Sequence, residues 1–254
     1  MRLIAHGRTD KGLVRKGNED AFCIEEELGL LAIADGMGGH TSGEVASRMA
    51  IEILRDSLRR EGEPFPEGLN SGVKLANKTI FEAAQSQSQL NGMGTTLTAV
   101  QLSGNRLSIA HVGDSRVYLI RGGVIEQMTD DHTIVFEQVV RGLMTREEAA
   151  RSGMRNLLSR ALGIGPEVKV DIEELTVSEN DKLVLCSDGL SELVSEDEIL
   201  LEVQSSQRPD MACDELIHLT NQRGGEDNIT VIVAYLHREN LLFSLLRMLG
   251  WTRR

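Results

Sequence analysis

The sequence lacks any block rich in lysine or arginine. Its 39 acidic residues outnumber its 27 basic residues, and the net charge at pH 7 is −12. A protein that binds nucleic acid needs clustered basic side chains to neutralise phosphates, so the composition excludes nucleic acid as the main partner. The acidic surplus favours solubility and leaves carboxylates that a cation could use.

Long apolar runs are also missing. The sequence contains no run of about 18 apolar residues, which a transmembrane helix would need. The N-terminal MRLIAHGRTDKG has no apolar core of the kind found in signal peptides. The three cysteines (Cys23, Cys186 and Cys213) are widely spaced, which fits buried thiols in a reducing compartment better than a disulfide framework. We therefore expect a cytoplasmic protein without a transmembrane segment.

Several catalytic signatures are absent as well. No pair of histidines or cysteines has the spacing of a zinc site. No G-x-S-x-G sequence offers a nucleophilic serine, and no DTG or DSG repeat indicates an aspartic protease. The paired glycines are too sparse for a dinucleotide-binding loop. The candidate chemistry is therefore sought among the acidic residues.

Hydrophobic periodicity predicts strands in antiparallel groups with helices between them. We expect strands over 3–5, 21–24, 30–34, 95–102, 106–112, 116–120, 124–128, 168–177, 182–186 and 228–235, and helices over 41–61, 69–84, 131–163, 195–203 and 209–223. This order differs from β-α-β alternation and favours a layered α+β fold. No internal repeat or dividing linker is present, so we expect a single domain.

Acidic residues recur where apolar strands begin or end. Four aspartates share this position (Asp35, Asp114, Asp188 and Asp227), and Glu19 and Asp20 adjoin the start of another strand. If they gather at one sheet edge, two charges about 5 Å apart repel by roughly 0.8 kcal/mol in water and by more near protein. Either one carboxyl is protonated or a cation lies among them. The candidate ligands are all oxygens, which favours Mg²⁺ or Mn²⁺ over Zn²⁺.

The glycines after Asp35 add a second kind of ligand. Gly36, Gly38 and Gly39 form a loop with almost no side-chain bulk, through which a backbone carbonyl can approach a ligand closely. The Gly36 carbonyl is thus a candidate ligand beside Asp35. Taken alone, the stretch is also compatible with a tight turn in which Asp35 is only a cap.

Eight short motifs occur in a characteristic order: RKGNEDA (15–21), ADGMGGH (34–40), MGTTL (93–97), HVGDSR (111–116), TDDHT (129–133), SRALG (159–163), LCSDGL (185–190) and GGEDNITV (224–231). Together they resemble the metal-dependent protein phosphatases of the 2C type (the PPM family), particularly the compact bacterial members. The resemblance covers about residues 7–236.

The resemblance implies a four-layer α-β-β-α sandwich, in which two antiparallel sheets pack face to face between helices. A single catalytic domain would span residues 1–237, with a helical flap at about 132–158 and an apolar, basic tail at 238–254. The implied activity is hydrolysis of phosphoserine and phosphothreonine in proteins. A hydroxide that bridges two Mn²⁺ or Mg²⁺ ions about 3.5–4 Å apart would attack phosphorus in line.

The resemblance also implies roles for single residues. Asp35 would bridge the two metals, with the Gly36 carbonyl on one of them and with Asp188 and Asp227 on the other. Asp114, together with Asp188, would hold a third and weaker metal. Glu19 and Asp20 would act directly or through water, and Arg15 would bind the substrate phosphate.

One position departs from the pattern. Some family members have a histidine directly after the Asp-Gly pair, proposed as the general acid, whereas this chain has Met37. His40 lies three residues further on, where a hydrogen bond that stabilises the loop is the expected role. Protonation of the leaving group would then fall to a metal-bound water.

Several alternatives remain open at this point. The same fold could serve as a non-catalytic regulatory or docking module, or the metals could act on a small phosphorylated metabolite. We expect a monomer, phosphorylated proteins as substrates and a cognate serine/threonine kinase as a partner in signalling. The segment 241–251 (LLFSLLRMLGW) is expected to pack as a terminal helix, with docking to a partner or a membrane surface as the alternative.

Overall fold

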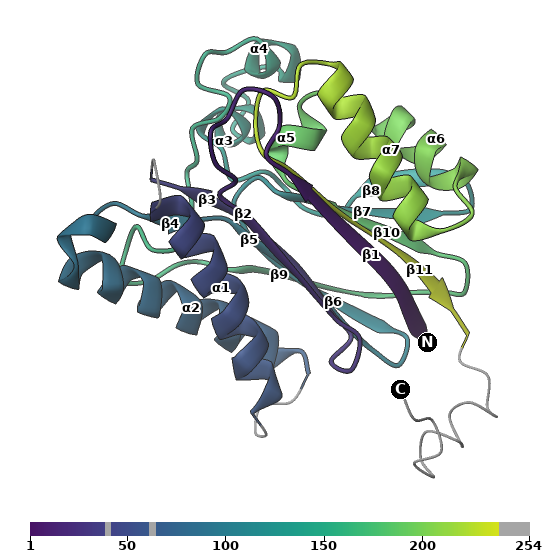
Figure 1. Ribbon diagram of the computed structural model, residues 1–254, viewed down its shortest axis with the longest axis horizontal. Coiled ribbons are helices and arrows are strands. Elements are labelled where there is room, and N and C mark those ends of the chain that lie inside the picture. The colour runs from purple at the N-terminus through teal and green to yellow at the C-terminus, as the bar shows by residue number, and fades with distance from the viewer. Residues whose placement is uncertain (39–41, 61–64, 239–254) are drawn as a thin grey trace.

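Two antiparallel sheets pack face to face between two layers of helices (Figure 1). The computed structural model describes residues 1–38, 42–60 and 65–238. Helices α1 (Ser42–Arg59) and α2 (Glu67–Ser86) cover one outer face, and α6 (Glu196–Ser205) and α7 (Pro209–Gln222) cover the other. The predicted four-layer α-β-β-α sandwich is confirmed.

The first sheet contains five strands in the order β1-β11-β10-β7-β8, and every neighbouring pair is antiparallel. Its strands are β1 (Arg2–Asp10), β7 (Arg116–Arg121), β8 (Val124–Gln127), β10 (Lys182–Cys186) and β11 (Ile229–His237). The last described strand therefore lies between the first strand and β10.

The second sheet contains six strands. Five follow the order β2-β3-β5-β6-β9, and the short β4 pairs with β3. The strands are β2 (Asp20–Glu25), β3 (Leu30–Met37), β4 (Gly94–Thr95), β5 (Leu97–Ser103), β6 (Arg106–Val112) and β9 (Asp171–Thr176). Short turns join neighbouring strands into antiparallel hairpins, in agreement with the predicted antiparallel groups. They lie at 26–29 and 104–105 in this sheet and at 122–123 in the first sheet.

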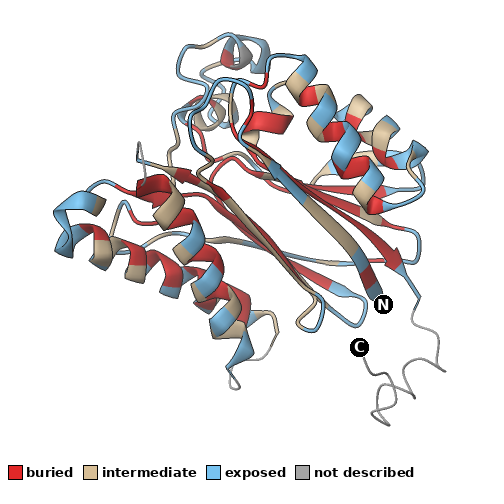
Figure 2. Ribbon diagram, in the orientation of Figure 1, coloured by how far each residue is buried: buried red, intermediate tan, exposed pale blue. Residues whose placement is uncertain are grey.

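The apolar runs are continuous because the central strands are covered on both faces (Figure 2). Along β3, Leu30, Ala32 and Ala34 pack toward α1 and α2. Leu31 and Ile33 instead join the core between the two sheets. Strands β10 and β11 alternate in the same way, between that central core and the core beneath α6 and α7.

The predicted helix over 131–163 is wrong for most of its length. Only α3 (Ile134–Val140) and α4 (Arg146–Ala150) are helical, and Gly142, with a φ of 70°, ends the first of them. Beyond α4 the backbone pairs with distant segments. Leu158 forms a β-bridge with Thr133, and Leu162 forms one with Thr95. These tertiary hydrogen bonds satisfy the backbone in place of a helix.

Smaller differences lie at strand ends. The strand predicted over 95–102 is interrupted at Thr96, and the strand predicted over 168–177 begins only at Asp171. The short helix α5 (Asp188–Ser191) was not predicted. The capping boxes formed by Thr145 with Glu148 and by Ser195 with Glu198 are present.

Some sequence predictions fall on residues outside the described ranges. They include the roles suggested for His40 and for the segment 241–251. Within 1–38, 42–60 and 65–238, no helix is long and apolar enough to cross a membrane.

Two histidines, His111 of β6 and His132 before α3, contact each other with ring centroids 4.6 Å apart and ring planes tilted by 41°. His111 Nδ1 lies 2.8 Å from the Thr98 hydroxyl, and its Nε2 lies 3.0 Å from the Asp130 carbonyl. A carbonyl only accepts, so Nε2 carries a proton. Burial, reinforced by His132, lowers the pKa of His111 to about 3. Both histidines are hydrogen-bonded through both ring nitrogens.

This buried ring predicts sensitivity to acid. In the unfolded chain a histidine binds a proton near pH 6.5, whereas folded His111 does so only near pH 3, so stability is lost as pH falls below about 6.5. Between pH 7 and pH 4.5, wild type should lose roughly 2–3 kcal/mol more unfolding free energy than His111→Gln, measured in urea. The exposed His218→Gln is the control and should behave like wild type. Equal pH dependence of wild type and His111→Gln would contradict this account.

Candidate metal centre

A cavity of about 790 Å³ lies at one end of the sandwich, where β3 and β6 of the second sheet and β10 of the first sheet end and where β11 of the first sheet begins. Seven of the eight residues named from the sequence line it: Arg15, Glu19, Asp35, Gly36, Asp114, Asp188 and Asp227. The eighth, Asp20, is buried and pairs with Asp35 in the β2–β3 register. Strand pairing joins Asp20 to Asp35, and the face-to-face packing of the two sheets brings in carboxylates from segments that are far apart in the chain.

Backbone hydrogen bonds fix Asp35. Its N–H donates to the Thr96 hydroxyl at 2.9 Å, and its carbonyl accepts from the Thr96 N–H and the Thr95 hydroxyl, each at 2.8 Å. Thr96 lies where the strand is interrupted between β4 and β5, so the interruption holds the end of β3. Gly36 donates its N–H to the Glu19 carbonyl at 3.2 Å, which leaves its own carbonyl for other contacts.

Asp20 connects the two sheets. Its Oδ2 accepts hydrogen bonds from the Ser187 hydroxyl at 2.9 Å and from the Thr230 hydroxyl at 2.6 Å. Asp20 belongs to β2, whereas Ser187 follows β10 and Thr230 lies in β11. This junction holds the end of β10, and hence Asp188, against the second sheet.

The loop that carries Arg15 is attached through Asn228. The side-chain Nδ2 of Asn228 donates to the backbone carbonyls of Lys11 and Gly17. Its side-chain Oδ1 accepts from the Glu19 N–H. Arg15 Nη2 donates to Asp227 at 2.5 Å. The guanidinium is therefore placed at the rim of the carboxylate cavity.

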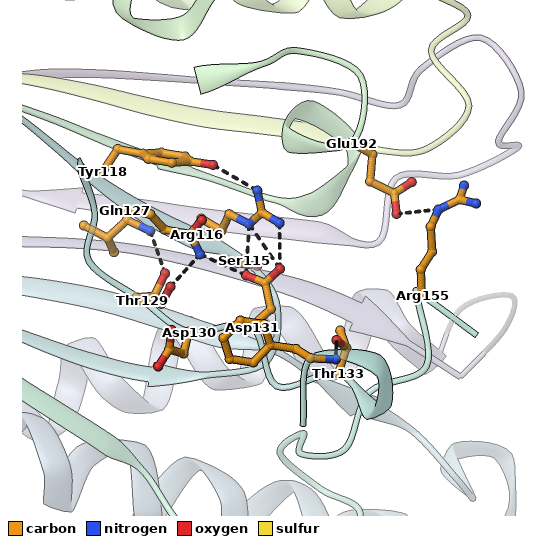
Figure 3. Close-up of polar contacts among 12 residues, drawn as sticks. Ser115, Arg116, Tyr118, Gln127, Thr129, Asp130, Asp131, Thr133, Arg155 and Glu192 are labelled. Atoms are coloured by element: carbon orange, nitrogen blue, oxygen red, sulfur yellow. Dashed lines mark hydrogen bonds and ion pairs between the residues drawn. The ribbon is translucent and has the colours of Figure 1, made fainter. Parts of the chain in front are cut away.

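A polar network surrounds Arg116, two residues after Asp114 (Figure 3). Arg116 donates through Nε and Nη2 to the Asp131 carboxylate and through Nη1 to the Tyr118 hydroxyl. A second cavity of about 480 Å³ adjoins this network and shares Asp114, Asp188 and Asp227 with the first. Arg155 and Glu192 form an ion pair of 3.5 Å at its wall.

Crowding of carboxylates raises their pKa values. Burial, followed by the charges of the neighbouring aspartates, raises the pKa of Asp35 and of Asp188 well above the ordinary value. Burial raises the pKa of Asp20 to about 6, although its two hydroxyl donors oppose the shift. Burial and the charge of Asp131 raise the pKa of Asp114 to about 7. Ionising all of them together requires positive charge in the cavity.

The donor set fits a divalent cation that prefers oxygen ligands. Asp188 Oδ1 and Asp20 Oδ1 are buried oxygens without a hydrogen-bond partner among the described residues. All the candidate donors are carboxylate or carbonyl oxygens, as Mg²⁺ and Mn²⁺ prefer. Within the described part of the chain, however, no three His, Cys, Asp or Glu side chains form a closed metal-binding cluster. The candidate ligands are instead spaced around the cavity.

Sequence reasoning left several cavity residues without a role. Lys16, Met37, Ser159 and Arg160 line the same cavity, while Thr96 also supports Asp35 from its wall. Ser159 and Arg160 belong to the SRALG motif and Thr96 to the MGTTL motif, so their positions were visible in the sequence. Their contacts depend on long-range pairing, which no local pattern reveals. Met37 follows Gly36, and its thioether has no proton that it could donate as a general acid.

Comparison with known proteins agrees with this geometry. Residues 13–228 match the family model described as Protein phosphatase 2C. The serine/threonine phosphatase stp of Listeria monocytogenes is 39% identical over 238 residues, covering 91% of this chain and 94% of that protein.

Solved structures give the same relationship. The Mycobacterium tuberculosis serine/threonine phosphatase PstP/Ppp superposes with a TM-score of 0.88 at 41% identity, covering 94% of this chain and all of that one. The catalytic domain of PstP in complex with two manganese ions gives a TM-score of 0.85 at 40% identity, covering 93% of this chain and 99% of that one. The chain therefore belongs to the protein phosphatase 2C family.

Proposed function

We propose that this serine/threonine phosphatase hydrolyses phosphoserine and phosphothreonine in proteins with two Mn²⁺ or Mg²⁺ ions in the carboxylate cavity. The observation that carries the proposal is the convergence of the Asp35, Asp114, Asp188 and Asp227 carboxylates from both sheets in one cavity, which Gly36 also lines, with Asp20 paired to Asp35 in the neighbouring strand. The PstP catalytic domain, to which the chain is 40% identical, binds two manganese ions.

We assign the ligands by position. Asp35 and the Gly36 carbonyl at the end of β3 would hold the ions together with Asp188 and Asp227. Asp114 would share a third, weaker site with Asp188, while Glu19 and Asp20 would act directly or through water. When bound, the ions lower the pKa of a water molecule so that hydroxide can attack phosphorus, and they neutralise the phosphoryl oxygens.

The chain's own residues orient the substrate. Arg15 offers a planar guanidinium that can donate two parallel hydrogen bonds to a phosphoryl group. Its ion pair with Asp227 places that guanidinium beside the cavity before substrate arrives. Asn228 keeps the loop in register, so Arg15 and Glu19 approach the cavity from the same side.

The proposal extends to the setting of the enzyme. A single catalytic domain of residues 1–237, a monomeric state, a cytoplasmic location and a cognate serine/threonine kinase are parts of it. The segment 132–158, which contains α3 and α4, would act as a flap at the second cavity. Cys23, Cys186 and Cys213 are free thiols, which suits a reducing compartment.

Removal of metal tests the proposal. Wild type stripped with EDTA should lose at least about 10³-fold in kcat/KM on a phosphothreonine peptide, because the ions supply several kcal/mol of charge stabilisation. Addition of Mn²⁺ in excess should restore activity. The measurement is phosphate release, with a small phosphorylated metabolite as the competing substrate. Activity that persists in EDTA would refute the metal mechanism. No activity in Mn²⁺ would favour the non-catalytic docking module. A higher kcat/KM on the metabolite than on the peptide would make small phosphorylated metabolites the substrate class in place of phosphoproteins.

A further inference from the structure

Arg160 is a cation on the cavity wall that the proposed chemistry does not use. It lies between α4 and β9, and its side chain is 26% exposed. Its Nη1 donates to Asp171 Oδ1 at 2.8 Å and, more weakly, to the Lys169 carbonyl at 3.4 Å. Asp171 is the first residue of β9, so a strand of the second sheet anchors the guanidinium.

His132 completes this anchor. The Gly113 N–H donates to His132 Nδ1 at 3.1 Å, so the ring proton must be on Nε2. Nε2 then donates to Asp171 Oδ2 at 3.0 Å. The His132 carbonyl accepts from the Ser159 N–H at 2.8 Å, which attaches the neighbouring backbone to the same group. Arg160 is therefore held in one orientation before any ligand binds.

One edge of this guanidinium remains available. Arg116 and Arg121 both use the Nε and Nη2 edge to contact a carboxylate, Asp131 and Asp181 respectively. Arg160 leaves the corresponding edge without a hydrogen-bond partner among the described residues. The neighbouring Ser159 Oγ is also buried, and within the described ranges it has no partner. Both residues line the carboxylate cavity.

The cavity has room for more than a phosphoryl group. Its volume of about 790 Å³ lies within the range that encloses a whole drug-sized ligand, so residues next to the phosphorylated side chain can enter. Arg15 is paired with Asp227 beside the carboxylates. Arg160 belongs to a different wall, anchored to β9, and can therefore meet a different part of the substrate.

We propose that Arg160, with the Ser159 hydroxyl beside it, forms an anionic subsite that accepts an acidic side chain adjacent to the phosphorylated residue of the substrate. This inference rests on the proposed phosphoprotein phosphatase function. A carboxylate that binds the open edge of Arg160 forms two charge-assisted hydrogen bonds and also supplies an acceptor for Ser159. His132 and Asp171 are positioning residues, since they act on the substrate only through Arg160.

Matched phosphothreonine peptides test the subsite. The panel varies one residue at a time, Glu against Gln, at the two positions before and the two positions after the phosphothreonine. We expect wild type with Mn²⁺ to prefer Glu about tenfold in kcat/KM, mainly through KM, at one of these positions at least. Arg160→Gln should reduce that ratio to within about twofold. Arg155→Gln, which removes the same charge from the adjoining cavity, should keep the wild-type ratio.

The outcomes separate failure of the proposed function from failure of the subsite. If wild type hydrolyses no peptide, the proposed function fails; if it hydrolyses all of them but prefers Glu at no position, the subsite fails alone. A preference that survives Arg160→Gln, or that Arg155→Gln removes equally, overturns the inference. If Arg160→Gln does not fold by circular dichroism, Arg160→Lys decides. Its compact ammonium lacks the bidentate edge, so the preference should fall to about threefold, and a full tenfold preference would overturn the proposal.

Discussion

Replacing Asp188 with asparagine is expected to lower kcat/KM on a phosphothreonine peptide by about 10³-fold while stabilising the metal-free protein. The loss of activity follows from removing one anionic oxygen donor from the proposed metal centre, where several kcal/mol of charge stabilisation correspond to that factor. The gain in stability has a separate cause. The raised pKa of the buried Asp188 carboxyl means that ionising it at neutral pH costs folding free energy.

The sign of the stability change follows from the direction of that pKa shift. A carboxyl whose pKa is raised by folding holds its proton more tightly in the folded state, so it opposes folding once pH exceeds the ordinary value near 3.8. Asparagine carries no charge at any pH, and its amide group can donate hydrogen bonds to neighbouring carboxylates. The unfolding free energy of metal-free Asp188→Asn at pH 7.5 should therefore exceed that of metal-free wild type.

Thermal unfolding and phosphate release measure the two effects on the same samples. Mn²⁺ should raise the Tm of wild type, because a ligand that binds only the folded state stabilises it. The rise should be much smaller for Asp188→Asn. Asp197→Asn, on the exposed first turn of α6, is the matched control and should retain activity and metal response. Full activity in Asp188→Asn, or a metal-free Tm below that of wild type, would contradict the assignment.

The second large effect is expected for Gly36→Ala. A Cβ atom at Gly36 would lie 2.1 Å from the Gly43 carbonyl oxygen and 2.6 Å from the Glu19 carbonyl oxygen. Both are backbone atoms, which cannot rotate away as a side chain would. The end of β3 would have to move from the start of α1 and from β2, so we expect a loss of roughly 3 kcal/mol or more in unfolding free energy.

Activity should fall together with stability in this variant. Displacing Gly36 also displaces Asp35 and the carbonyl proposed to bind metal, so Mn²⁺ affinity measured by calorimetry should drop sharply. Gly17→Ala is the matched control on the neighbouring loop, because no atom lies within 4 Å of the corresponding Cβ position. It should stay within about 0.5 kcal/mol of wild type. If Gly36→Ala matched Gly17→Ala in stability and metal affinity, close packing at Gly36 would not matter.

The sequence is informative wherever burial imposes a pattern. Strands β3, β10 and β11 are covered on both faces, so each is a continuous apolar run that can be recognised in isolation. Asp35, Asp188 and Asp227 could be located because they interrupt or precede these runs. The layer order of the fold was predicted from the family resemblance that the ordered motifs carry, because periodicity alone does not specify it.

The features that could not be predicted from the sequence depend on contacts between distant segments. Beyond α4 the chain is stabilised by bridges to Thr95 and Thr133, so its helix-like composition was misleading. The anchor of Arg160 joins Gly113, His132 and Asp171 from three separate segments of the chain. Hydrogen bonds of this kind leave no spacing rule in the sequence, and only the folded backbone brings their partners together.

The place of β11 in the first sheet has a consequence for biosynthesis. This strand is the last one described along the chain, yet it lies between β1 and β10 and pairs with both. Until β11 leaves the ribosome, β1 has no partner in this sheet and Asp227 is not in place. A nascent chain that stops before about residue 237 should therefore lack the complete proposed site, and we expect dephosphorylation to begin only after the last strand has been synthesised and inserted.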